Sequence, residues 1–382
     1  MKVCISQLLI NQKLNLIMKV VYIHKGFFQK RPPVISAVTI LNKLGYDITL
    51  ITAGLSQEWA DKLMQMNIKF FVIECKRKTV IGKLFDFLNF RKKTFSLLEQ
   101  NGYTPDNTLL WIENANTLVA LGNGIKRFKY NLQLQELYDQ SPREMFYIRR
   151  VINDAEAIYM PEYNRCAIYR VWFKLKKTPY LLPNKTYFVP SEETLAKLKE
   201  KHKKVLGFFT NKKVILYQGI IHKERDLSPF VKAVKELGGD FLMVLLGDDY
   251  GMIDNYKRID PNVLHIKSLP APDYLAITSC AYIGVVTYDP LELNTTFCAP
   301  NKIYEYGYYG LPMIGNDIPG LRYSVGHYNA GVLVDAENEQ EVKEAIVYIS
   351  NHYEELSKNS KLLYESTDNI ATIKQSMNAI SL

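Results

Sequence analysis

The sequence has few cysteines, and they form no recognisable pattern. Five occur in 382 residues. None belongs to a Cys-x-x-Cys pair or to a Cys/His cluster. This scatter argues against a disulfide framework and a zinc site and indicates a reducing compartment. An Asp-x-Asp motif in a plausible loop is also missing, so we expect neither a metal nor another cofactor.

Long apolar runs are missing as well. No run approaches the roughly 18 to 20 residues that cross a bilayer. The first segment, "MKVCISQLLINQKLNLIMKVV", is interrupted by Asn, Gln and Lys and makes a poor signal peptide. We expect a cytoplasmic protein in which residues 1–17 are an extension outside the first domain, or follow an upstream start codon, with Met18 opening the first strand.

What the chain does have is positive charge, +9 overall. Nucleic acid, an anionic membrane surface and an anionic small substrate are the three partners that this charge suits. No helix-turn-helix, zinc or aromatic RNA-binding motif accompanies it, so we expect no nucleic-acid partner.

Short β-rich runs alternate with helical patterns along the whole chain. This alternation predicts parallel sheets with helices on both faces, and the length suits two domains. We predict an N-terminal domain over 18–190 and a C-terminal domain over 191–360, joined at the proline-containing stretch 180–191. A last helix within 361–382 is expected to pack back on the N-terminal domain. Strands are predicted at 19–26, 46–52, 68–75, 108–114, 156–162, 212–219, 240–248, 263–268, 282–288, 311–317 and 330–335.

The stretch "APNKIYEYGYYGLPMI" (299–314) carries the first chemical signal. Pro300 suits the first turn of a helix, and Gly310 suits its end. Asn301 and Glu305 share a face of this helix, whose N-terminus offers free N–H groups to a diphosphate. Glu305 beside such a site would accept hydrogen bonds from a ribose diol; a capping Asn with a solvated Glu is the equally open alternative.

Two flanking segments complete the predicted site. The preceding "LELNTTFC" (291–298) is expected to be a loop that brings Asn294, Thr295 and Thr296 to the ligand. In "LYQGIIHKERDL" (216–227), Gly219 permits close backbone approach and Arg225 can clamp a diphosphate through its planar fork.

These segments, with "GVLVD" further on, resemble the C-terminal domain of the GT-B retaining glycosyltransferases of family four. The resemblance covers about 212–337 and implies two Rossmann-like domains facing each other across a cleft. It implies that Glu305 binds ribose and that Arg225 binds the diphosphate. Since the leaving diphosphate gains negative charge, Lys302 is expected to add positive potential there. The first Glu of the family's Glu-x7-Glu pattern is Phe297 here, and a partner Arg is Ile220. The sugar contact would then come from the backbone of 294–298.

The resemblance also implies an activity. The expected reaction transfers a sugar from a nucleotide-sugar, with UDP favoured, to a glycan or lipid-linked acceptor, with retention and without a metal, in bacterial capsule, O-antigen or other surface polysaccharide synthesis. Two alternatives stay open. One is another GT-B enzyme, either a nucleotide-sugar epimerase or an inverting transferase. The other is a non-catalytic nucleotide-binding partner protein, because half of the carboxylate pattern is missing.

The N-terminal half is expected to bring the acceptor. By family analogy Gly26 lies near the donor phosphates, and Arg31 in the loop "GFFQKRPP" would assist. "QELYD" resembles a His-Glu-Leu-Tyr stretch of relatives with Gln in place of His, which leaves Glu136 as a polar residue at the reacting centre. Glu162 and Arg165 would contact the acceptor or form a structural ion pair. We interpret His24 as a strand-end or core histidine.

The segment "KRKTVIGKLFDFLNFRKK" (76–93) interleaves basic and apolar residues. At helical spacing it gives a basic, aromatic stripe that suits an anionic membrane surface. The alternative is an amphipathic helix that buries its Phe residues in the protein's own core.

Overall fold

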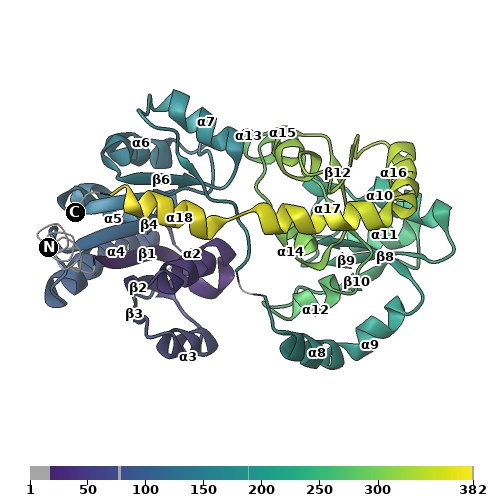
Figure 1. Ribbon diagram of the computed structural model, residues 1–382, viewed down its shortest axis with the longest axis horizontal. Coiled ribbons are helices and arrows are strands. Elements are labelled where there is room, and N and C mark those ends of the chain that lie inside the picture. The colour runs from purple at the N-terminus through teal and green to yellow at the C-terminus, as the bar shows by residue number, and fades with distance from the viewer. Residues whose placement is uncertain (1–17, 76–78, 188, 381–382) are drawn as a thin grey trace, which may run out of the picture. The chain divides into compact units, whose positions relative to one another are not determined.

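The computed structural model describes residues 18–75, 79–187 and 189–380 (Figure 1). The predicted extension 1–17 therefore lies outside the described residues. The chain forms two compact units, one of 1–161, 165–182 and 369–382 and the other of 162–164 and 183–368. Apart from residues 162–164, which belong to the second unit, the chain crosses from the first unit to the second between Leu182 and Pro183. This crossing lies within the stretch 180–191, which carries the linker prolines.

Unit 1 holds a parallel sheet of seven strands in the order β3-β2-β1-β4-β5-β6-β7. Its first three strands in sequence are separated from the later ones at the β1/β4 junction, where the strand order reverses. Such a reversal opens a crevice at the carboxyl ends of the strands, where ligands of these folds bind. The strands are β1 (Lys19–Phe27), β2 (Asp47–Gly54), β3 (Lys69–Val72), β4 (Thr108–Glu113), β5 (Lys129–Gln133), β6 (Ala157–Met160) and β7 (Tyr180–Leu181).

Helices cover the sheet of unit 1. Strand β4 is buried along its whole length and β1 is buried over residues 20–24, as central strands of a parallel sheet are. The helices and short helical turns are η1 (Phe28–Lys30), α2 (Pro32–Lys43), α3 (Gln57–Gln65), α4 (Val80–Gln100), α5 (Ala115–Leu121), η2 (Gly122–Arg127), α6 (Pro142–Val151), η3 (Ile152–Asp154) and α7 (Tyr163–Trp172, which crosses the unit boundary).

Unit 2 repeats the arrangement with six parallel strands in the order β10-β9-β8-β11-β12-β13. The strand order reverses here between β8 and β11, so the same rule places a ligand crevice at their carboxyl ends. The strands are β8 (Lys213–Gln218), β9 (Phe241–Leu246), β10 (Leu264–Ile266), β11 (Ile283–Val286), β12 (Met313–Asn316) and β13 (Gly331–Val334).

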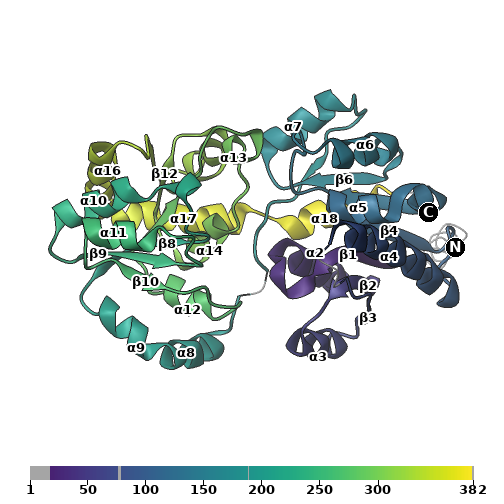
Figure 2. The ribbon, with the colours of Figure 1, turned by 180° about the vertical axis from the view of Figure 1, so that it is seen from behind.

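Two apolar layers hold the sheet of unit 2. One lies under α10 and α16 and the other under α14 and α17; Figure 2 shows the same helices from behind. The helical segments are α8 (Glu192–Lys201), α9 (Lys203–Leu206), η4 (Gly207–Phe209), η5 (Lys223–Arg225), α10 (Ser228–Leu237), α11 (Ile253–Ile259), α12 (Tyr274–Thr278), α13 (Leu293–Thr296), α14 (Lys302–Tyr309), α15 (Pro319–Leu321), η6 (Arg322–Gly326), α16 (Glu339–Asn351) and α17 (Tyr353–Ser366).

After α17 the chain returns to unit 1 as α18 (Asn369–Asn378). Two contacts fix this helix on the sheet: the Tyr159 hydroxyl lies 2.6 Å from Ser376 Oγ, and Asn131 Nδ2 lies 3.7 Å from Met377 Sδ. The C-terminal segment therefore contributes buried residues to the core of the unit that begins the chain.

Three sequence predictions differ from the structure. The predicted linker 180–191 begins with the short strand β7, which pairs with β6. Residues 129–133 form β5, an internal strand of the sheet. The sequence did not predict this strand because Asn131 and Gln133 in "KYNLQ" are polar, although both side chains are buried. The expected loop 291–298 contains the helical turn α13, because the Glu292 and Thr295 side chains cap it reciprocally.

Candidate functional site

The crevice of unit 2 lies where β8 ends and α14 begins. Gly219 follows β8 with a φ of +143°, a backbone conformation that residues other than glycine rarely adopt. A Cβ added there would lie 3.3 Å from Nζ of Lys302, the first residue of α14. At its other end, α14 stops at Gly310, which has the left-handed conformation that the sequence predicted. The backbone of β8 and the lysine of α14 thus meet at one point.

Lys302 is a buried amine. Its side chain is 7% exposed, and Nζ finds no hydrogen-bond partner among the described residues. Nζ instead lies 4.3 Å from the centre of the Tyr217 ring and 5.7 Å from that of Tyr288. Burial, followed by the nearby Arg225 guanidinium, lowers the pKa of Lys302 to about 7.

Arg225 ends η5 and uses the same two tyrosines. Its Cζ lies 4.7 Å from the centre of the Tyr288 ring, and its guanidinium hydrogen-bonds the Tyr217 hydroxyl. Tyr217 OH also donates to the Ile220 carbonyl, at 2.9 Å. Two basic side chains from different elements therefore face one pair of rings at the end of β8, and the Arg225 guanidinium supplies fixed positive charge there.

Glu305 lies one turn beyond Lys302 and is 6% exposed. Its Oε1 accepts a hydrogen bond from the Tyr274 hydroxyl at 2.5 Å, and its Oε2 accepts one from the Gln218 amide. Burial raises the pKa of Glu305, while the bond from Tyr274 and the charge of Lys302 act in the opposite direction. An ionised carboxylate has about four acceptor positions, so Glu305 keeps the capacity to accept from a further donor.

The remaining predicted residues of this domain lie in or beside α13. The Thr295 and Thr296 hydroxyls donate to backbone carbonyls of their own segment, at 2.9 and 2.8 Å. Asn301 precedes α14 without a side-chain capping bond. The structure therefore brings together Gly219, Arg225, Lys302 and Glu305, whereas the two threonine hydroxyls are engaged locally and Asn294 lies in the same turn.

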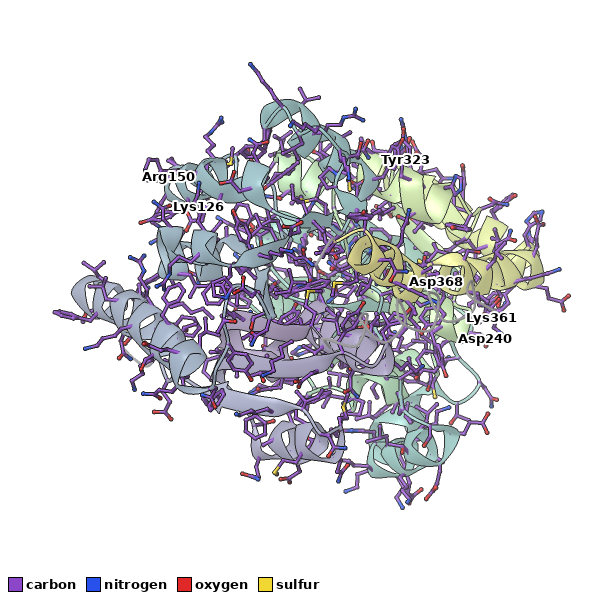
Figure 3. All side chains as sticks on the ribbon, turned by 60° about the vertical axis from the view of Figure 1, so that its left-hand side comes forward. Lys126, Arg150, Asp240, Tyr323, Lys361 and Asp368 are labelled. Carbon is purple, nitrogen blue, oxygen red and sulfur yellow. The ribbon has the colours of Figure 1, made fainter. Side chains whose placement is uncertain are left out.

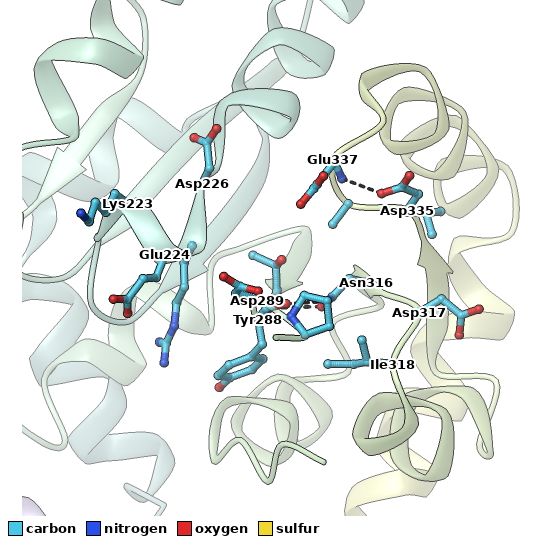
Figure 4. Close-up of a pocket in the computed structure, with 15 residues that line it drawn as sticks. Lys223, Glu224, Asp226, Tyr288, Asp289, Asn316, Asp317, Ile318, Asp335 and Glu337 are labelled. Atoms are coloured by element: carbon cyan, nitrogen blue, oxygen red, sulfur yellow. Dashed lines mark hydrogen bonds between the residues drawn. The ribbon is translucent and has the colours of Figure 1, made fainter. Parts of the chain in front are cut away.

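A pocket of about 530 Å³ opens beside this cluster, at the ends of β8, β11, β12 and β13 (Figure 4). Arg225 and Tyr288 line it, but Gly219, Lys302 and Glu305 do not. Its wall carries more carboxylates than cations, so a diphosphate is better placed on the Arg225 side than inside it. The carboxylates are Glu224, Asp226, Asp289, Asp317, Asp335 and Glu337.

Unit 1 has its own pocket, of about 420 Å³, at the strand-order reversal between β1 and β4. Gly26 and Arg31 both line it, together with His24. His24 Nδ1 lies 2.6 Å from Glu113 Oε2, and both side chains are buried. A Cβ on Gly26 would fall 2.4 Å from His24 Nε2. Gly26 is needed here because the histidine ring occupies that space.

The other predicted residues of the N-terminal half are spread over several contacts. Glu136 is exposed, and its backbone carbonyl accepts a hydrogen bond from the Tyr169 hydroxyl. Arg165 is buried and donates to the Gln135 carbonyl. Glu162 is buried and accepts from Asn164 Nδ2 at 2.7 Å. None of the three lines the pocket that holds Gly26 and Arg31.

The predicted stripe over 76–93 is divided in the structure. Residues 76–78 lie outside the described part, and the rest forms the start of α4. Phe90 is in the core, but Leu84, Phe85 and Leu88 are 62%, 57% and 49% exposed. Arg91 donates to the Ala120 and Val119 carbonyls and is not a surface cation. Helix α4 therefore serves the core and also leaves an apolar face outside.

Helix α6 extends this face. Its Arg143 lies 5.4 Å from the ring centre of Phe87 on α4, and its Phe146 is 54% exposed with Arg150 5.2 Å from the ring centre. Figure 3 shows Arg150 and Lys126 on one side of unit 1. We call Leu84, Phe85, Leu88 and Phe146 the apolar face of unit 1.

Sequence reasoning missed the partners that shape the unit 2 cluster. Tyr217 and Gln218 end strand β8 next to Gly219, and Tyr288 follows β11. Their positions at the carboxyl ends of two adjacent strands were a usable signal. Tyr274 gave no such signal, because it reaches Glu305 from α12, 31 residues away.

Within 18–75, 79–187 and 189–380 no three His, Cys, Asp or Glu side chains gather in a way that would hold a metal ion. No helix in these ranges has the length and apolar character to cross a membrane.

Comparison with known proteins agrees with this geometry. Residues 212–352 match the sequence profile of the family described as "Glycosyl transferases group 1". Unit 2 is therefore similar to this family over the matched residues. The match covers β8 to α16 and includes Gly219, Arg225, Lys302 and Glu305. No curated protein sequence matches the chain.

Solved structures show the fold of the whole chain. HepE of Anabaena in complex with UDP-glucose is 14% identical, with 94% of this chain and 98% of that chain covered and a TM-score of 0.70. Sucrose-phosphate synthase of Thermosynechococcus elongatus is 15% identical, with 94% and 97% covered and a TM-score of 0.68. WaaG, a glycosyltransferase involved in lipopolysaccharide biosynthesis, is 11% identical, with 95% and 100% covered and a TM-score of 0.64. The two Rossmann-like units form a GT-B fold.

Proposed function

We propose that this protein is a glycosyltransferase that moves a sugar from a nucleotide-sugar, with UDP as the favoured nucleotide, to a glycan or lipid-linked acceptor. The observation that carries the proposal is the meeting of Arg225 and Lys302 over Tyr217 and Tyr288 at the end of β8. Support comes from the group 1 profile over the same residues and from the UDP-glucose complex of HepE.

The chemistry of transfer needs positive charge at the diphosphate. When the sugar–phosphate bond breaks, the sugar carbon becomes oxocarbenium-like and the leaving diphosphate gains negative charge. Fixed positive groups stabilise that charge more in the transition state than in the bound donor. Arg225 supplies such a group without a metal, so we propose metal-independent transfer in which the leaving phosphate accepts the acceptor's proton and the sugar configuration is retained.

Glu305 holds the ribose in this proposal. Its remaining acceptor capacity suits a ribose hydroxyl, and Tyr274 and Gln218 fix the carboxylate in place. The missing first Glu, replaced by Phe297, leaves sugar contacts to the backbone of 294–298. Asn294, Thr295, Thr296 and Asn301 stay in the proposed donor set through this segment.

Unit 1 would serve the acceptor. Its pocket with Gly26 and Arg31 is the proposed starting point, and Glu136, Glu162 and Arg165 remain proposed acceptor residues at lower priority. The apolar face of unit 1, flanked by Lys83, Arg143 and Arg150, suits an anionic membrane surface. We therefore propose synthesis of a surface polysaccharide on the cytoplasmic side of a bacterial membrane, a role of the kind that the name of WaaG carries.

Product formation tests this function. The protein is incubated with UDP-glucose, UDP-galactose or GDP-mannose, with EDTA and with a membrane lipid extract, and free nucleotide and glycosylated lipid are measured together. Release of nucleotide in step with a glycosylated product supports transfer. Nucleotide binding without any turnover favours the non-catalytic alternative, and conversion of the donor into an isomeric sugar nucleotide favours the epimerase.

A further inference from the structure

The unit 2 cluster holds a buried basic group, Nζ of Lys302, that has no hydrogen-bond acceptor among the described residues. Arg225, which is charged at every relevant pH, shares Tyr217 and Tyr288 with it. A protonated amine placed there would be desolvated and would repel a second cation.

The groups that face Lys302 from its surroundings do not neutralise it. Strand β8 contributes the Tyr217 ring, η5 contributes Arg225, and the segments beside α14 contribute Tyr288 and Cys298. The one carboxylate among these groups is Glu305, and its oxygens already accept bonds from Tyr274 and Gln218.

Three more elements pack on α14. Helix α12 contributes Tyr274, which bonds Glu305, and β11 contributes Gly284, which faces Tyr306. Helix α17 lies at the far end of α14. Its Ser360 and Tyr364 face Gly307, and its Lys361 faces Gly310. These residues are one to two turns beyond Lys302, so α17 brings no counter-charge to Nζ.

We infer that Lys302 is uncharged in the empty site and takes up one proton from solvent when a nucleoside diphosphate binds beside it. The inference rests on the proposed function and goes further, because it makes donor binding dependent on pH. A diphosphate brings two negative charges to the pair of cations. The protonated amine then gains the counter-charge and the hydrogen-bond acceptors that it lacks in the empty protein. The lowered pKa of Lys302 agrees with this geometry.

Calorimetry measures this proton directly. The full chain is titrated with UDP-glucose, whose diphosphate has no group titrating near neutral pH, in Tris, HEPES and imidazole at equal ionic strength. The slope of binding enthalpy against the ionisation enthalpy of the buffer gives the number of protons taken up. We expect about 0.9 proton at pH 8, since a pKa near 7 leaves about a tenth of the free amine charged. Affinity should fall about tenfold per pH unit from 8 to 9.

Three variants assign the proton. Lys302→Met places an uncharged side chain at this position, and Lys302→Arg places a permanently charged one there. Neither side chain titrates near neutral pH, so both variants should bind UDP-glucose with a slope near zero. Glu305→Gln should keep the uptake, because the proton goes to the lysine. Lys257→Met changes an exposed lysine of α11 and should behave as the wild type.

The outcomes separate the inference from the function. Binding of UDP-glucose with a slope of zero in the wild type overturns the inference and leaves the proposed function standing. Uptake that persists in Lys302→Met also overturns it. If UDP-glucose, UDP and GDP all fail to bind, the donor site is wrong and the inference falls with it. The wild-type slope alone decides whether a proton is taken up on binding, so this part of the test does not depend on the folding of any variant.

Discussion

Lys302 and Glu305 are neighbours on one face of α14, but their charged ends have opposite surroundings. The Glu305 carboxylate accepts two protein hydrogen bonds, whereas the Lys302 amine has none among the described residues. A helix that satisfies its carboxylate and not its amine is arranged for an anion that arrives from outside. The following predictions examine that arrangement and its surroundings.

Lys302→Met should stabilise the empty protein. The pKa of Lys302 is about 7 in the fold and about 10.4 in an unfolded chain. Between these values the unfolded chain binds a proton that the folded one does not, so stability rises with pH, and below pH 7 the full penalty applies. We expect a gain of about 2 to 4 kcal/mol in the free energy of unfolding at pH 6, roughly half as large at pH 9, measured by urea denaturation. An equal or lower stability of the variant would contradict the buried, unpaired amine.

Glu305→Gln should weaken nucleotide binding. Glutamine keeps the shape of glutamate and one acceptor oxygen, but its amide nitrogen is a donor and cannot accept from a ribose hydroxyl. This loss should cost about 1 to 3 kcal/mol of binding free energy. Isothermal titration with UDP checks this. The matched control is uridine 5′-monophosphate against deoxyuridine 5′-monophosphate, which should differ in the wild type and bind alike to the variant. Unchanged affinity of Glu305→Gln for UDP would remove Glu305 from the ribose site.

Arg225→Ala should lower turnover more than donor affinity. The charge on the leaving diphosphate grows in the transition state, so a cation beside it contributes more to kcat than to binding. Turnover and the donor Kd are measured on the same preparation, with Lys257→Met as the surface control. Equal losses in both quantities would make Arg225 a binding residue only.

Gly26→Ala should disturb the pocket of unit 1. The new Cβ would meet His24 Nε2 at 2.4 Å and force the His24 ring away from Glu113. We expect a loss of about 1 to 3 kcal/mol in the free energy of unfolding. Gly207→Ala, where a Cβ meets nothing within 4 Å, is the control and should be nearly neutral. An unchanged melting temperature of Gly26→Ala would contradict this prediction, because it would show that the His24 ring can move aside without loss of stability.

The apolar face of unit 1 can be tested on vesicles. Serine at Leu84, Phe85 and Leu88 should reduce sedimentation with phosphatidylglycerol vesicles and leave the melting temperature unchanged, since these side chains are exposed. Serine at the buried Phe90 is the contrasting variant and should destabilise the fold. Vesicle binding that survives the triple substitution would assign this face to another partner.

The fold was accessible from sequence because buried parallel strands are apolar and short. Eleven strand segments were predicted where the structure has strands, and two strands were missed. The short strand β7 lies in the predicted linker, and β5 was missed since Asn131 and Gln133 are polar side chains held inside by hydrogen bonds. Burial of that kind depends on distant partners such as Trp111, which spacing along the chain does not show.

The candidate site was accessible only in part, for a similar reason. Gly219, Arg225, Lys302 and Glu305 stand in short segments with a readable order, and the structure brings them together. The hydrogen bond from Tyr274 and the two rings around Lys302 are long-range contacts, and the burial that lowers the pKa of this lysine follows from them. His24 was interpreted as a core histidine. It is buried, but its contact with Glu113 and its place in a pocket are also products of the fold.

The most direct measurement is titration of the protein with UDP, GDP and their glucose and mannose derivatives in the presence of EDTA. The account predicts micromolar binding of one nucleotide family, which is weakened at least a hundredfold when Arg225→Ala and Lys302→Met are combined. Absence of binding by every compound, or binding that the double variant retains, would contradict a donor site at the end of β8.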